Sequence, residues 1–273
     1  MNQPHISPTT AVRHIILDTE TTGLSAKHGH RIIEIACLEL VNHRPTGRSF
    51  HTYIDPERPC DPDATRVHGL TDSFLLGKPT FVDKVDDILN FVAGATLVIH
   101  NAPFDLAFLN AELQRLQRPA LHHTVAQVID TLAMARQAYP GKRHSLDALC
   151  ERFDIDRSGR QLHGALLDAQ LLAKVYQHLR TQKIERDLEA KLRAPSAPNP
   201  LDDQTLWLEY LTTCLPEDAR VEVTIVQHFS ANGAKPSPTH CSFKVRTLDI
   251  HLNSMPHLSC QLKFVDQFDG DAA

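Results

Sequence analysis

Two carboxylates near the start of the chain, Asp18 and Glu20, have the spacing of a catalytic or metal-binding pair. They follow the apolar run IIL at residues 15–17, which is typical of a buried strand. Residues two apart on a strand point to the same face, so both carboxylates would lie side by side. Such groups repel each other unless a proton or a cation lies between them, and Mg²⁺ prefers oxygen ligands. An isolated Asp-x-Glu is more often simply solvated, so other residues have to decide.

Three residues farther along the chain can complete such a site. Asp105 lies just inside a helix expected to begin near Phe104, where an acidic residue also interacts favourably with the helix dipole. His163 and Asp168 are five residues apart, and on one ideal helix they would point about 140° away from each other. They act together only if His163 lies in the loop before the helix and Asp168 on its second turn. Gly164 permits this arrangement.

The apolar periodicity predicts the elements that position these residues. After the first strand, further strands are expected at 31–41, 48–54, 96–99 and 125–129, with Pro45-Thr46-Gly47 as the hairpin connection between the first two. Helices are expected at 81–93, from about 104, at 132–138, after an N-cap at Ser145, and at 162–183. Hairpin strands followed by alternating strands and helices predict an α/β fold, a mixed sheet flanked by helices.

The later part of the chain predicts a domain boundary. Residues 1–182 form the first expected domain, and residues 183–200 a linker that is first charged and then rich in proline. Residues 201–273 are expected to form a small α+β domain with one helix at 202–215 and antiparallel strands at 220–229, 241–252 and 258–268. The apolar alternation reverses between Val245 and Leu248, which indicates a bulge or bend in the middle strand.

Charge and composition narrow the class of protein. The formal net charge of −5 comes entirely from residues 201–273, so the rest of the 273-residue chain is neutral. A protein that held nucleic acid by phosphate neutralisation alone would be strongly basic, so any such contact should be local, metal-assisted or helped by a partner. No apolar stretch is long enough to span a membrane, and the N-terminus lacks the pattern of a secretory signal. Six scattered cysteines without a CxxC pair fit the reduced thiols of a cytoplasmic protein.

Four segments together resemble the motifs of the DEDDh family of 3′→5′ exonucleases. They are LDTETTG, VIHNAPFDLAFL, GKRHSLDALC and LHGALLDAQLLA, and the likeness extends over residues 12 to about 180. Within that family the chain most resembles the epsilon (proofreading) subunits of bacterial DNA polymerase III. The resemblance implies a ribonuclease H-like fold and a metal-dependent DNA exonuclease that releases nucleoside 5′-monophosphates from 3′ ends.

The resemblance also implies a role for each motif residue. Two divalent cations, Mg²⁺ or Mn²⁺, would be held chiefly by Asp18, Glu20 and Asp168, and Asp105 would act mostly through a water molecule on a metal. The chemistry would be a two-metal in-line displacement that stabilises the attacking and the leaving oxygen. His163 would take a proton from the attacking water, a task that suits an imidazole near neutral pH.

Substrate contacts follow less directly from the resemblance. Asp63 and His68 match positions that touch the terminal nucleotide in the family, and Thr21 and Leu24 would line its pocket. Phe104 offers a face on which a base can stack. Leu24 and Phe104 are equally well explained as core residues.

The implied partners are DNA 3′ ends, the catalytic subunit of DNA polymerase III and the sliding clamp. The segment Gln204–Leu208 resembles the clamp-binding pentapeptide, although Trp207 and Leu208 equally suit the buried face of a helix. Two alternatives stay open. One is a stand-alone DEDDh nuclease that trims RNA or short oligonucleotides, because nothing in the sequence selects for or against a 2′-hydroxyl. The other is a polymerase-stabilising adaptor with secondary nuclease activity, against which the presence of all five motif residues argues.

Overall fold

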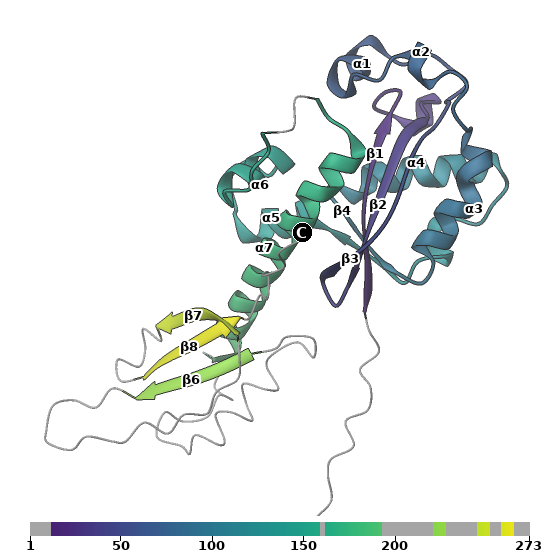
Figure 1. Cartoon of the computed structure of the whole chain (residues 1–273). Helices are drawn as coiled ribbons and strands as arrows, with labels where there is room; N and C mark the ends of the chain where they lie inside the picture. Colours follow the sequence, from purple (N-terminus) through teal and green to yellow (C-terminus); the bar gives the residue numbers. More distant parts are fainter. Residues whose placement is uncertain (1–11, 159–161, 193–220, 228–244, 252–257, 265–273) are drawn as a thin grey trace, which may run out of the picture. The chain divides into compact units, whose positions relative to one another are not determined.

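The computed structural model describes residues 12–158, 162–192, 221–227, 245–251 and 258–264. The chain divides into two units, residues 1–180 and 181–273, and each is described by itself. The first unit is built on a five-stranded sheet with the order β3-β2-β1-β4-β5 (Figure 1). Strands β1 to β3 are antiparallel neighbours, whereas β4 and β5 run parallel to β1, so the sheet is mixed as predicted.

Strand β1 (Arg13–Thr21) lies in the middle of this sheet. Its residues 14–17 are buried, because helices cover both faces of the sheet at this point. Its neighbours are β2 (Ile32–Val41) on one side and β4 (Thr96–Ile99) on the other. The outer strands are β3 (Arg44–Tyr53) and β5 (Gln127–Asp130). The Asp-x-Glu pair therefore lies near the C-terminal end of the central strand.

The hairpin between β2 and β3 turns earlier than the sequence predicts. Asn42 and His43, both with positive φ, form the connection, and Pro45, Thr46 and Gly47 belong to strand β3. A two-residue turn with positive φ at both positions matches the twist of the flanking strands, and Asn adopts that conformation readily. Pro45 is tolerated because β3 is an edge strand. The prediction that residues 45–47 form the connection is wrong.

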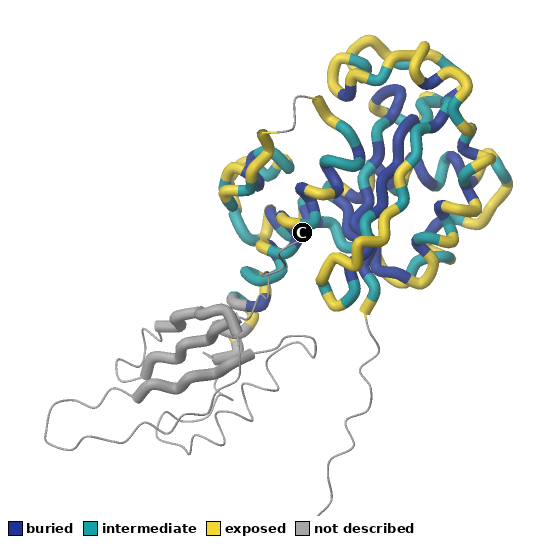
Figure 2. Tube along the Cα trace, viewed as in Figure 1, coloured by how far each residue is buried: buried dark blue, intermediate teal, exposed yellow. Residues whose placement is uncertain are grey.

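Helices α3 (Phe81–Val92) and α4 (Ala102–Arg115) cover one face of the sheet. The odd-numbered residues Ile15 and Leu17 of β1 pack against them in one apolar cluster. Figure 2 shows that buried residues are concentrated along the central strands of the sheet, while the outer loops and helices are more exposed. The short helices α1 (Pro62–His68) and α2 (Asp72–Leu75) lie between β3 and α3 in the chain, and single 3₁₀ turns occur at η1 (Ala26–His28) and η2 (Leu121–His123).

Helix α7 (Ala165–Leu192) covers the opposite face. Its Ala169 and Leu172 pack against Ile16, the even-numbered position of β1, while α5 (Thr131–Ala138) and α6 (Leu146–Arg152) pack against α7 in a further cluster. The Ser145 hydroxyl accepts the N–H of Ala148, which confirms the predicted N-cap of α6. Helix α7 continues through residues 183–192, which the sequence placed in the linker.

In the second unit, strands β6 (Val221–Gln227), β7 (Val245–His251) and β8 (Leu258–Phe264) form an antiparallel sheet with the order β6-β8-β7. The register shifts between Val245 and Thr247, which confirms the irregularity expected there. The helix predicted at 202–215 lies outside the described residues. Within the part of the chain that is described, no helix is both long and apolar enough to cross a membrane.

Candidate active site

The first two site residues come from strand β1 and face helix α7. Asp18 and Glu20 share the parity of Ile16, which packs on α7, so the prediction that they share one face is confirmed. Both residues are partly buried. Thr21, Thr22 and Gly23 follow, and a Cβ on Gly23 would lie 2.4 Å from the ring of His30, so only glycine fits this turn.

His163 and Asp168 approach the pair from the start of α7. His163 lies in the connection before the helix, and its Nδ1 is 3.2 Å from Oδ2 of Asp168. The Asp168 N–H donates to the carbonyl of Gly164, which closes the first turn of the helix. His163 and Asp168 can touch although they are five residues apart, because His163 precedes the helix and only Asp168 lies on it. Glu20, His163 and Asp168 each offer one atom that could bind a metal ion, and these three atoms lie within 4.8 Å of one another.

Asp105 reaches the strand from the other layer of the fold. It lies in the first turn of α4, is 3% exposed, and its Oδ1 accepts the hydroxyl of Thr19 at 2.7 Å. Thr19 points to the α4 face, between the two carboxylates that point to the α7 face. Burial raises the pKa of Asp105 to about 7, although the hydrogen bond from Thr19 opposes this shift.

Electrostatic repulsion is concentrated at Asp18. Its pKa is raised well above 3.8, first by burial and then by the negative charge of four nearby carboxylates, which in decreasing order of effect are those of Asp105, Glu20, Asp168 and Glu34. Such mutual repulsion among carboxylates fits a site for divalent cations, which would relieve it. The side chains suited to hold them are those of Asp18, Glu20, Asp168 and Asp105.

The predicted substrate-contact residues differ in their surroundings. Leu24 is 88% exposed, so it is not a core residue and its apolar side chain is available to a base. Thr21 is buried, and its hydroxyl donates to the carbonyl of Gly23. Phe104 is half-buried against the α4 core, with its ring 4.9 Å from that of Phe108, so packing explains much of its presence. The roles of all three in substrate binding remain predictions.

His68 and Asp63 both lie on α1. His68 is 4% exposed, and among the described residues its Nε2 has no hydrogen-bond partner, while its Nδ1 accepts the N–H of Leu70. Burial and then the nearby His163 lower the pKa of His68, which favours the neutral ring. Asp63 is exposed and pairs with Arg66 of the same helix, a contact that does not direct it toward the site.

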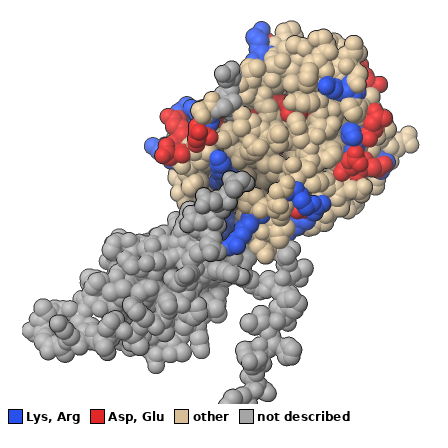
Figure 3. Space-filling model, in the orientation of Figure 1, with Lys and Arg blue, Asp and Glu red and all other residues tan. Residues whose placement is uncertain are grey.

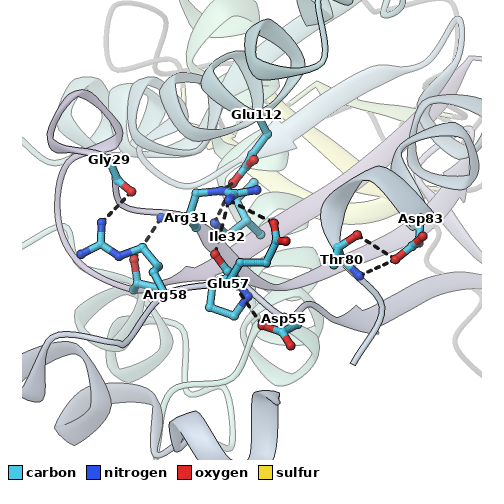
Figure 4. A network of polar contacts seen from close by, with 11 residues as sticks. Gly29, Arg31, Ile32, Asp55, Glu57, Arg58, Thr80, Asp83 and Glu112 are labelled. Carbon is cyan, nitrogen blue, oxygen red and sulfur yellow. Dashed lines mark hydrogen bonds and ion pairs between the residues drawn. The ribbon is translucent and has the colours of Figure 1, made fainter. Parts of the chain in front are cut away.

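A polar network that the sequence reasoning missed fixes α4 against the sheet (Figure 4). Arg31, which precedes β2, donates through Nε to Glu112 at 2.6 Å, and the same Glu112 oxygen accepts the N–H of Ile32. Glu112 is buried and lies two turns after Asp105 on α4, so both point the same way. A second missed residue is Glu34 of β2. For Glu34 the available signal was an acidic residue within an apolar strand, whereas Glu112 carries no such signal in the sequence.

Comparison with known proteins agrees with this geometry. The family described as "Exonuclease" (RNase_T) matches residues 15–176. A relative named DNA polymerase III subunit epsilon, from Rickettsia felis, is 54% identical over 171 residues, covering 62% of this chain and 75% of the relative. The protein of the same name from Escherichia coli K12 is 53% identical over 173 residues, covering 62% of this chain and 71% of the relative.

Solved structures show the same fold. The nuclease domain of 3′hExo, a DEDDh family member bound to rAMP, superposes with a TM-score of 0.54 at 19% identity, covering 65% of this chain and 94% of that domain. An exonuclease I from Methylocaldum szegediense gives 0.56 at 16% identity, covering 66% and 43%. The chain therefore belongs to the exonuclease family, with a ribonuclease H-like α/β domain and the activity of a 3′→5′ exonuclease. Over that domain, more than half of its residues are identical to those of the DNA polymerase III epsilon subunits from R. felis and E. coli.

Proposed function

We propose that this chain is the proofreading 3′→5′ exonuclease of a bacterial replicative polymerase, DNA polymerase III, and works in the cytoplasm. The observation that carries the proposal is the meeting of Glu20, His163 and Asp168 at the end of β1, within a domain more than half identical to epsilon subunits. The substrate would be a DNA 3′ end and the product a nucleoside 5′-monophosphate.

The residues divide the work in this proposal. Asp18, Glu20 and Asp168 hold two divalent cations, Mg²⁺ or Mn²⁺, with Asp105 supporting them from the α4 side. When bound, such ions stabilise charge on the attacking and leaving oxygens of a phosphodiester. The carboxylates would fix the positions of the ions because all four lie on rigid elements, the central strand and the first turns of two helices.

His163 acts as the general base. Its side chain is 46% exposed, so a water molecule can reach it, while Asp168 is only 6% exposed and holds the imidazole through Nδ1. With Nδ1–H donating to Asp168, the lone pair of the neutral ring lies on Nε2, which would take the proton of the attacking water.

A bound polymerase would supply much of the affinity for DNA. Lys and Arg are scattered among Asp and Glu on the face shown in Figure 3, without one dominant basic area. Residues 1–200 carry no net charge. A nuclease that relies on a bound polymerase to deliver the primer end needs no large basic surface of its own.

The direct test is a gel assay with 5′-labelled primers that are fully paired, mispaired at the 3′ end, or made of RNA, each with Mg²⁺, Mn²⁺ or EDTA. Metal-dependent shortening of DNA from the 3′ end, faster at the mispair, is expected. Preference for RNA would overturn the proofreading role in favour of an RNA-trimming nuclease. No cleavage of either would leave only the role of a polymerase-stabilising adaptor.

Clamp binding through Gln204–Leu208 remains part of the proposal, and this segment lies outside the described residues. Replacing Gln204 and Trp207 with alanine should weaken retention on immobilised clamp while nuclease activity on a short oligonucleotide stays unchanged. Unchanged clamp retention by the double variant would remove this segment from the proposed interface.

A further inference from the structure

A buried carboxylate outside the five motif residues lies directly beside the site. Glu34 of β2 is in register with Glu20 of β1, and its neighbour along the ladder, Ala36, pairs with Asp18. Residues paired in this way point to the same face of the sheet, so Glu34 faces helix α7 together with the two catalytic carboxylates. Its exposure is only 3%.

Both oxygens of Glu34 are engaged by protein donors. Oε1 lies 2.7 Å from Nε2 of His51 on β3, and Oε2 accepts the N–H of Ala165 at 3.2 Å. Ala165 is the first residue of α7, where the N–H groups have no partner inside the helix and where negative charge is favourable. A Cβ on Gly164 would lie 4.0 Å from the same Oε2, so the backbone before the helix passes against this carboxylate.

The contacts of Glu34 determine where the connection before α7 stands. The N–H of His163 donates to the carbonyl of Val67 at 3.1 Å, which holds one end of the connection to α1. Glu34 holds the other end, two residues later, to the central part of the sheet. His163 and Asp168 are therefore placed relative to Glu20 by a side chain that is the direct cross-strand neighbour of Glu20.

We propose that Glu34 is a positioning residue for the exonuclease reaction, which acts by fixing the N-terminus of α7 and with it His163 and Asp168. One of its oxygens contacts His51 and the other accepts the N–H of Ala165, so the contacts that the structure gives it are structural ones. The length of the Glu34 side chain, which brings Oε2 to the N–H of Ala165, determines this positioning, and its charge does not. The inference rests on the exonuclease activity stated above.

Two variants separate reach from charge. Glu34→Gln keeps an oxygen at the same distance from Ala165 but removes the charge. Its amide NH₂ can donate to Nε2 of His51 when that ring carries its proton on Nδ1 instead. Glu34→Asp keeps the charge but withdraws the oxygen by one methylene. Steady-state digestion of a single-stranded oligonucleotide with saturating Mg²⁺ should show kcat within about threefold of wild type for Glu34→Gln, and about 100-fold lower for Glu34→Asp, because small misplacement of catalytic groups has effects of that size. KM should change by less than about threefold in both, since the nucleotide contacts are unaltered.

Glu39 supplies the matched control on the same strand. It is also buried and paired, with Arg13 and Arg48, but it lies toward the other end of β2, opposite Ile15. Glu39→Asp should leave kcat unchanged even where the midpoint of thermal unfolding falls as much as in Glu34→Asp.

The outcomes are decisive in each direction. A Glu34→Asp variant as active as Glu34→Gln, or a Glu34→Gln variant as impaired as Glu34→Asp, would overturn positioning by reach. Equal loss of kcat in Glu39→Asp would show a general loss of stability instead and would also overturn the proposal. A wild-type protein that digests no oligonucleotide would instead contradict the exonuclease assignment itself.

Discussion

Asp105→Asn should stabilise the metal-free protein while it removes most of the nuclease activity. The carboxyl is almost fully buried and accepts a hydrogen bond from Thr19, which the amide oxygen of Asn can also accept. The variant therefore keeps the shape and the bond but removes a charge that burial disfavours. A site residue that is unfavourable without its cations is what a metal-binding function predicts.

The size of the effect follows from the pKa of Asp105, which is raised from 3.8 to about 7. A pKa raised in the folded state means that the folded protein binds the proton more tightly, so stability falls as pH rises from 3.8 toward 7 and is then level. Integrated over this interval, the difference corresponds to about 4 kcal/mol in the free energy of unfolding. Asp105→Asn lacks this dependence, so its advantage over wild type should be near zero at pH 4 and largest above pH 7.

The assay is urea denaturation in EDTA at several pH values between 4 and 8. Asp86→Asn, at a carboxylate that is 70% exposed, is the control and should track wild type throughout. A gap between Asp105→Asn and wild type that stays constant with pH would refute the reasoning, because the gap must follow the ionisation of the buried group. With Mg²⁺ the variant should digest an oligonucleotide about 10- to 100-fold more slowly, as expected for a residue that supports metal ligands.

Three further substitutions test other contacts. His163→Ala should lower kcat by about 10²- to 10⁴-fold while calorimetric Mn²⁺ binding survives, whereas Asp168→Ala should lose both; equal loss of metal binding would contradict the division between base and ligand. Thr19→Val removes the donor to Asp105 and should raise the pKa of that carboxyl further, so activity at pH 6 should fall more than activity at pH 8, and a uniform fall in a pH–rate profile would argue against it. Glu112→Ala removes the buried partner of Arg31, whose partly buried guanidinium keeps only the exposed Glu57 and the carbonyl of Pro56. It should reduce the free energy of unfolding by about 2 kcal/mol in urea denaturation, and a loss below about 0.5 kcal/mol would show that water replaces the bond.

The sequence predicted those features that depend on local pattern. Apolar periodicity located β1, β4 and α3, and the alternation of side chains placed Asp18 and Glu20 on one face. The hairpin turn was misplaced because Pro-Thr-Gly is a stronger turn signal than Asn-His, although only the latter keeps the β2–β3 register. The register between β2 and β3 also shifts between Leu38 and Leu40, where a bulge accommodates the extra residues of β3.

The contacts that hold the elements of the site in place could not be predicted from local sequence patterns. Glu34 reads as one charged residue in an apolar strand, and its partner Ala165 lies far along the chain. Glu112 likewise reads as an ordinary helix residue until Arg31 is brought beside it. Such contacts are set by which helix covers which face of the sheet, and periodicity does not specify that pairing.

The order in which the chain supplies its site has a consequence for biosynthesis. Glu20 leaves the ribosome early, whereas His163 and Asp168 follow only after every strand of the first sheet has been made. Contacts between residues so far apart in the chain require closure of a long loop, which slows their formation. A nascent or prematurely ended chain that stops before α7 lacks the general base and one metal ligand, so it has no cutting activity. A complete set of site residues therefore exists only once α7 has been made.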